Sequence, residues 1–106
     1  MTALDLTQFS VLIVDDNPNN LFTLEALLTE RLGVEVIQAT SGMTALAVLL
    51  ERSVDVIILD VQMPGLDGFE TAKMIKQRKR DANVPIIFLT AAAKREEDIE
   101  EGFDLG

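Results

Sequence analysis

Two adjacent carboxylates, Asp15 and Asp16, directly follow the apolar run of residues 11–14. Two acids side by side at the end of a buried strand repel each other and lose hydration, so a counter-charge is needed to keep both ionised. Asp60 ends a second apolar run, and Thr90 ends a third. If the fold brings these strand ends together, three carboxylates and a hydroxyl group meet in one place.

A hard divalent cation is the counter-charge that such a cluster favours. Mg²⁺ prefers oxygen ligands and often needs only one or two carboxylates besides water and phosphate oxygens. The chain contains no His and no Cys, the residues that select zinc or copper. A calcium loop that starts at Asp15 fits poorly, because Asn20 stands where the loop needs glycine and Ala26 stands where it needs a bidentate glutamate.

A carboxylate beside bound Mg²⁺ can also act as a nucleophile and form an aspartyl phosphate. Asp60 is the stronger candidate nucleophile, because it stands alone at its strand end and a loop follows it. Asp15 and Asp16 are the stronger candidate metal ligands. Each acid taken singly has an ordinary explanation as a cap or turn former, and Asp67 is expected to be a helix N-cap. Their combination at one edge of a sheet favours a functional site.

The elements that must position these residues alternate between short apolar strands and amphipathic helices. Asn17 is a good N-cap, Pro18 suits the first helical position, and Gly33 favours a helix end. The apolar spacing predicts strands over 11–15, 34–39, 54–60 and 84–90, and helices over 18–32, 41–52, 68–80 and from about 94 onward. The strand over 34–39 alternates in part, which is typical of a position nearer a sheet edge.

The helices are expected to face the sheet with residues at helical spacing. These residues are Leu21, Leu24, Leu27, Leu28 and Leu32; Ala45, Leu46, Leu49 and Leu50; and Phe69, Ala72 and Ile75. Continuous apolar strands joined by helical crossovers predict an α/β fold with a doubly wound parallel sheet. Right-handed crossovers allow the flavodoxin-like strand order 2-1-3-4-5, with the ligand at the switch point between strands 1 and 3.

Composition and charge narrow the functional classes. The 106 residues are 48% hydrophobic and 25% charged, which indicates one globular domain over residues 1–106. The net charge of −9 argues against a nucleic-acid partner. The basic run over 73–80 is expected to serve the C-terminal end of a helix. The sequence shows no signal peptide and no apolar run of membrane-spanning length, so we expect a cytoplasmic protein without a membrane partner.

Three motifs of this chain together resemble the receiver domain of two-component response regulators. They are VLIVDDNPNN (residues 11–20), VDVIILDVQMPGLDGFE (residues 54–70) and VPIIFLTA (residues 84–91). The resemblance extends from residue 11 to residue 106. It implies that Asp60 is the phospho-acceptor and that Asp15, Asp16 and Asp60 hold Mg²⁺ together with the backbone carbonyl of Gln62. It also implies that Thr90 is the switch hydroxyl.

The resemblance implies a signalling module rather than a metabolic enzyme. Its partner would be a histidine kinase or a histidine phosphotransfer protein, and its own catalysis would be at most self-phosphorylation and autodephosphorylation. Two alternatives stay open. One is a receiver-like binding or oligomerisation module that is inactive in phosphotransfer. The other is a magnesium phosphohydrolase, although such enzymes typically space their strand-end acids as Asp-x-Asp, whereas Asp15 and Asp16 are adjacent.

The family pattern continues beyond Gly106 with a fifth strand, a lysine at its end and a fifth helix. The resemblance therefore implies a receiver domain truncated at its C-terminus, and Lys94 does not replace the lysine because it follows the strand over 84–90 in a loop. That strand would then be an exposed edge, which can pair with another chain. A homodimer or an exchange of elements between two chains is accordingly expected.

Overall fold

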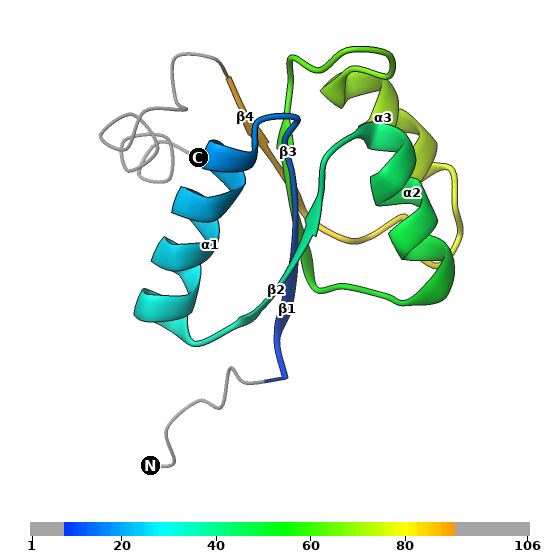
Figure 1. Cartoon of the computed structure of the whole chain (residues 1–106). Coiled ribbons are helices and arrows are strands. Elements are labelled where there is room, and N and C mark those ends of the chain that lie inside the picture. Colours follow the sequence, from blue (N-terminus) through cyan, green and yellow to red (C-terminus); the bar gives the residue numbers. More distant parts are fainter. Residues whose placement is uncertain (1–7, 91–106) are drawn as a thin grey trace.

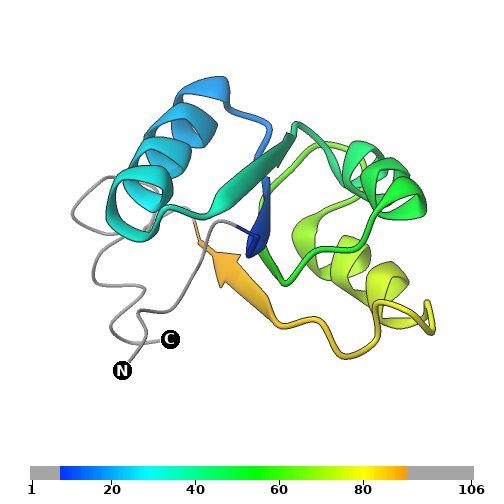
Figure 2. The same ribbon diagram turned by 90° about the horizontal axis from the view of Figure 1, so that it is seen from below.

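The computed structural model describes residues 8–90, which form a parallel sheet between two layers of helices (Figures 1 and 2). The strands lie in the order β2-β1-β3-β4. Helix α1 covers one face of the sheet, and α2 and α3 cover the other (Figure 1). The elements are β1 (Ser10–Val14), α1 (Pro18–Leu32), β2 (Glu35–Ala39), α2 (Gly42–Glu51), β3 (Val56–Asp60), α3 (Gly68–Lys76) and β4 (Ile86–Leu89).

This architecture confirms the predicted doubly wound, flavodoxin-like order 2-1-3-4. The strand over 34–39 was expected near an edge, and β2 is an edge strand. Within residues 8–90, β4 pairs only with β3, from Ile57↔Ile86 to Asp60↔Leu89. The expected helix from about residue 94 lies outside the described residues. None of the helices in the described part of the chain is both long and apolar enough to cross a membrane.

The three caps that the sequence predicts, Asn17, Gly33 and Asp67, each lie at a helix end. The Asn17 side chain accepts a hydrogen bond from the backbone of Asn19 at 2.9 Å, and Pro18 is the first residue of α1. Gly33 ends α1 in the left-handed conformation, with φ 66°. The Asp67 side chain caps α3 by accepting from the backbone of Glu70 at 2.8 Å. These caps fix where each helix starts relative to the preceding strand end.

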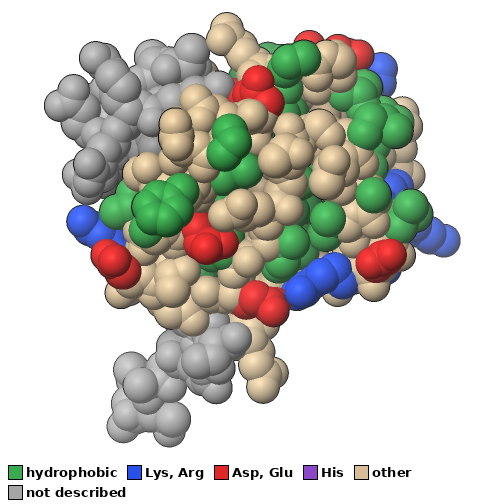
Figure 3. All heavy atoms as spheres, viewed as in Figure 1, with side chains coloured by type: hydrophobic (Ala, Val, Ile, Leu, Met, Phe, Trp, Pro, Cys, Tyr) green, Lys and Arg blue, Asp and Glu red, His purple; other side chains and the backbone are tan. Residues whose placement is uncertain are grey.

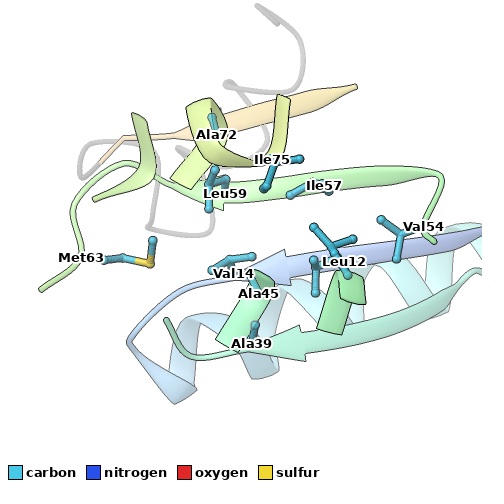
Figure 4. Packing of buried hydrophobic residues seen from close by; sticks show 11 residues of the cluster. Leu12, Val14, Ala39, Ala45, Val54, Ile57, Leu59, Met63, Ala72 and Ile75 are labelled. Carbon is cyan, nitrogen blue, oxygen red and sulfur yellow. The ribbon is translucent and has the colours of Figure 1, made fainter. Parts of the chain in front are cut away.

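The two faces of the sheet carry separate cores. The larger core, shown in Figure 4, joins β1, β2 and β3 to α2 and α3; its buried residues are Leu12, Val14, Ala39, Ala45, Leu49, Val54, Ile57, Leu59, Met63, Ala72 and Ile75. The second core lies under α1 and contains Val11, Ile13, Leu21, Leu24, Leu28, Val34, Ile58 and Leu89. Alternate residues of β1 enter opposite cores, as expected for a strand that is covered on both faces.

Three residues that were expected to face inward are exposed instead. Leu50 is 72% exposed, Phe69 is 59% exposed and Leu32 is 49% exposed. The buried stripe of α2 consists of Gly42, Ala45 and Leu49, and Leu50 lies about 100° around the helix from Leu49. Phe69 lies beside the buried stripe of α3, and its ring packs on that of Phe88 at 5.1 Å between centroids. Leu32 is the last residue of α1, directly before the Gly33 cap.

Helix α3 ends at Lys76 rather than at Arg80. The basic residues that follow bind backbone carbonyls instead of extending the helix. Arg78 donates to the carbonyl oxygens of Leu46 and Leu49 near the C-terminal end of α2, at 3.4 and 3.1 Å. The expected role of the basic run at a helix C-terminus is therefore confirmed, although the helix that it serves is α2 as well as α3. Figure 3 shows most Lys and Arg side chains of this face on the side of α2 and α3.

Candidate metal centre

The candidate site lies at the carboxyl ends of β1 and β3, where the strand order reverses. Val14 pairs with Leu59, so Asp15, directly after β1, and Asp60, the last residue of β3, lie at adjacent strand ends. On the other side of β3, Asp60 pairs with Leu89, so Thr90 lies one position beyond this pair. At the top of Figure 1, the turn after β1 lies beside the loop after β3. This is where doubly wound sheets bind ligands.

The structure brings the three predicted carboxylates together. Asp15, Asp16 and Asp60 each place one carboxylate oxygen within 4.8 Å of the others. The side chain of Asp60 is fully buried and that of Asp15 is 4% exposed, whereas Asp16 is exposed. Three like charges at this separation, two of them buried, favour a cation between them.

Neutral donors hold the two buried carboxylates. Oδ1 of Asp15 accepts a hydrogen bond from the backbone N–H of Asn17 at 2.9 Å, and its Oδ2 accepts one from Nδ2 of Asn20 at 3.2 Å. Oδ1 of Asp60 accepts a hydrogen bond from the backbone N–H of Gln62 at 3.0 Å. These hydrogen bonds orient the two carboxylates, and their donors are neutral groups.

The loop after Asp60 is held close to its strand by Gly68. The backbone N–H of Gly68 donates to the carbonyl of Val61 at 2.9 Å. A Cβ atom at position 68 would lie 2.2 Å from the carbonyl oxygen of Asp60, which is far inside van der Waals contact. An open hollow of about 560 Å³ lies along this loop and is lined by Val61, Gln62, Met63, Pro64, Asp67 and Phe69. The chain thus leaves space beside the Asp60 strand end.

The other predicted site residues lie nearby. Thr90 is exposed and directly follows β4, the strand next to β3. Gln62 is exposed, and its backbone N–H holds Asp60. Sequence reasoning missed Asn20 as a partner of Asp15. A signal was present, because Asn20 lies four residues before buried Leu24 and thus on the inner face of α1.

The donor set of the site fits magnesium. The three clustered side chains offer only oxygen atoms, two of the carboxylates are buried, and the whole chain lacks His and Cys. Oxygen-only sites of this kind suit Mg²⁺, Mn²⁺ and Ca²⁺ rather than zinc or copper.

Comparison with known proteins identifies the family. The response regulator receiver domain matches residues 11–106, nearly the whole chain. The chain therefore belongs to the response regulator receiver domain family. The N-terminal domain of a response regulator receiver protein from Methanoculleus marisnigri JR1 is 33% identical with a TM-score of 0.75, over 88% of this chain and 75% of that one.

A second solved structure bears on the metal. The receiver domain of sensor histidine kinase PA1611 from Pseudomonas aeruginosa PAO1 is 33% identical with a TM-score of 0.75, over 93% of this chain and 80% of that one. It is described with a magnesium ion coordinated in its active site cleft. Receiver domains bind Mg²⁺ at an acidic pocket, and this chain has a cluster of three aspartates at the corresponding edge of its sheet.

The curated relatives are longer proteins. A "Probable cyclic di-GMP phosphodiesterase" of Vibrio cholerae serotype O1 is 35% identical over 106 residues, which is 100% of this chain and 23% of that protein. "Sensor protein GacS" of Pseudomonas syringae pv. syringae is 37% identical over 100 residues, which is 89% of this chain and 11% of that protein. The chain thus spans less than a quarter of the length of these two relatives.

Proposed function

We propose that this chain is a phosphoacceptor module of a two-component phosphorelay, in which Asp60 accepts a phosphoryl group from a phosphohistidine. The observation that carries the proposal is the clustering of Asp15, Asp16 and fully buried Asp60 within 4.8 Å at the switch point of the sheet. The donor would be a histidine kinase or a histidine phosphotransfer protein, since the relatives include a sensor protein. Such a relay operates in the cytoplasm.

Different residues of this chain would carry out the separate parts of phosphoryl transfer. A carboxylate oxygen of Asp60 attacks phosphorus, the P–N bond to the donor imidazole breaks, and that imidazole leaves and takes up a proton. The Gln62 N–H fixes the rotation of the Asp60 carboxylate. Asp15 and Asp16, with the backbone carbonyl of Gln62, would hold Mg²⁺. When bound, the ion supplies the positive charge that reduces repulsion between Asp60 and the phosphoryl oxygens.

Thr90 would report the modification. Phosphorylation replaces about one negative charge on Asp60 by about two and adds strong acceptor oxygens. Thr90 directly follows β4, which pairs with β3 up to Asp60. Its hydroxyl would donate a hydrogen bond to one of these oxygens. Movement of Thr90 toward the phosphoryl group would shift the end of β4 and pass the signal to a partner surface.

The experiment is an intact-mass measurement after incubation of the 106-residue chain with a small phosphodonor such as acetyl phosphate. It is run with Mg²⁺ and with a chelator, on the wild type, Asp60→Asn and the control Asp67→Asn. Asp67 is the matched control because it lies in the same loop and caps α3, and asparagine also caps helices well.

The proposal predicts one added phosphoryl group in the wild type and in Asp67→Asn, only with Mg²⁺, and none in Asp60→Asn. An adduct that persists in Asp60→Asn refutes the assignment of the acceptor. An equal yield in the chelator refutes the role of the metal. A folded wild type that takes no phosphoryl group under any of these conditions would favour a binding module that is inactive in phosphotransfer.

A further inference from the structure

Asn20 is a polar residue on the face of α1 that packs against the sheet. Leu24 and Leu28 follow it at helical spacing, and both are buried. Asn20 is itself half-buried, and its carboxamide donates to Oδ2 of Asp15. A polar side chain on an apolar helix face is stable only with a partner of this kind. The hydrogen bond therefore couples the position of the Asn20 side chain to that of the Asp15 carboxylate.

The space around this pair is small and mostly apolar. A cavity of about 10 Å³ adjoins Asp15 and Asn20 and is otherwise lined by apolar side chains of β1, α1 and β4. This volume is at the lower limit for one water molecule. A hydrated metal ion does not fit in it. The cavity that adjoins Asp15 and Asn20 is therefore too confined to hold the ion.

The hydrogen bond of Asn20 opposes the repulsion inside the carboxylate cluster. Oδ1 of Asp15 is held by the Asn17 backbone N–H, which belongs to the same turn of the chain. The Asn20 donor on Oδ2 ties the other oxygen to α1, so the plane of the carboxylate is set from two directions. Repulsion from Asp16 and Asp60, both within 4.8 Å, favours rotation of Asp15 away from the cluster, and the Asn20 contact resists that rotation.

We propose that Asn20 is a positioning residue of the metal centre, which holds the Asp15 carboxylate in the orientation that Mg²⁺ requires. The inference rests on the proposed function, because it takes the carboxylate cluster as the Mg²⁺ site. Asn20 acts through Asp15 and does not itself bind the ion. Partners that orient metal ligands typically contribute about tenfold or more to metal affinity.

The test is the Mg²⁺ affinity of the 106-residue chain, measured by isothermal titration calorimetry without a phosphodonor. The variants are Asn20→Ala, the nearly isosteric Asn20→Leu, Asp15→Ala and the double variant Asn20→Ala with Asp15→Ala. Asn19→Ala is the matched control, because Asn19 is the neighbouring residue of the same helical turn and is exposed. Far-UV circular dichroism establishes that each variant is folded. If Asn20→Ala is not folded, the affinity of Asn20→Leu is compared with that of the wild type instead.

Loss of Asn20 is expected to weaken Mg²⁺ binding about tenfold, while Asn19→Ala stays within about twofold of the wild type. In the Asp15→Ala background, removal of Asn20 is expected to change the affinity no further. Wild-type affinity in folded Asn20→Ala or Asn20→Leu overturns the inference. A tenfold loss that persists in the Asp15→Ala background also overturns it, because Asn20 would then act independently of Asp15. A wild type that binds no Mg²⁺ refutes instead the metal centre of the proposed function.

Discussion

Replacement of Gly68 by alanine tests how tightly the fold holds the strand end that carries Asp60. The new Cβ atom would lie 2.2 Å from the Asp60 carbonyl oxygen and 2.7 Å from Cα of Val61. An ordinary contact begins at 3.4 Å, so α3 or the strand end must move by about 1 Å. Both contacts are with backbone atoms, which cannot rotate aside as a side chain would.

The expected loss of stability is about 2 kcal/mol. Forcing extra volume into a packed site costs about 1–3 kcal/mol, and clashes with backbone atoms inside 3 Å place Gly68→Ala at about 3 kcal/mol. Alanine has a lower chain entropy than glycine in the unfolded state, which offsets about 0.4–1 kcal/mol of this cost. Gly65→Ala is the matched control, because Gly65 has φ 75° but a Cβ atom at this position would meet nothing within 4 Å. Its expected loss is about 1 kcal/mol, from the left-handed backbone alone.

The assay is urea unfolding followed by far-UV circular dichroism, since the chain contains no Trp and no Tyr for fluorescence. A loss of about 2 kcal/mol in Gly68→Ala corresponds to a melting temperature lower by about 8–16 °C for a domain of this size. The steric reasoning is refuted if Gly68→Ala is no less stable than Gly65→Ala.

Three further predictions follow from the fold. Leu12→Ala should destabilise the protein by about 2–5 kcal/mol because Leu12 is fully buried, whereas Leu50→Ala should change stability by less than about 0.5 kcal/mol; equal losses in urea unfolding would contradict the assigned faces. The Arg52 guanidinium, 2.6 Å from Glu35, lowers the pKa of the Glu35 carboxyl. The ion pair therefore stabilises the fold fully above the ordinary glutamate pKa, and this stabilisation is lost as the pH falls through the lowered pKa. In Glu35→Gln, the melting temperature should fall less than in the wild type as the pH is lowered through this range. An equal fall in both proteins would count against the ion pair. The outer edge of β4 is unpaired within residues 8–90, so the chain should associate as its concentration rises, and a monomer at all concentrations in sedimentation would reject this.

The positions of the strand ends could be predicted from the sequence. The apolar runs before Asp15 and Asp60 predict buried parallel strands, and parallel strands bring their carboxyl ends to one edge of a sheet. The clustering of Asp15, Asp16 and Asp60 follows from this order alone. It needs no knowledge of how the individual side chains pack.

The width of each buried helix face could not be predicted in the same way. Helical spacing shows which residues share a side, but the neighbouring elements decide how far around the helix the contact extends. Leu49 is buried and adjacent Leu50 is exposed for this reason. Arg78 follows the end of α3, and its guanidinium binds carbonyls of α2 that are 32 and 29 residues away in sequence, a contact that helical spacing does not predict. Asn20 shows the same limit, because its partner becomes evident only once α1 is placed on the sheet.

The most direct test of the central claim locates the phosphoryl group within the chain. An acyl phosphate on aspartate is reduced by borohydride to homoserine, which peptide mass spectrometry can assign to a position. After phosphorylation with Mg²⁺, the account predicts homoserine at position 60, the fully buried carboxylate of the cluster. Homoserine at position 15 or 16 with none at position 60 would contradict the division of the cluster into an acceptor and a metal-binding pair.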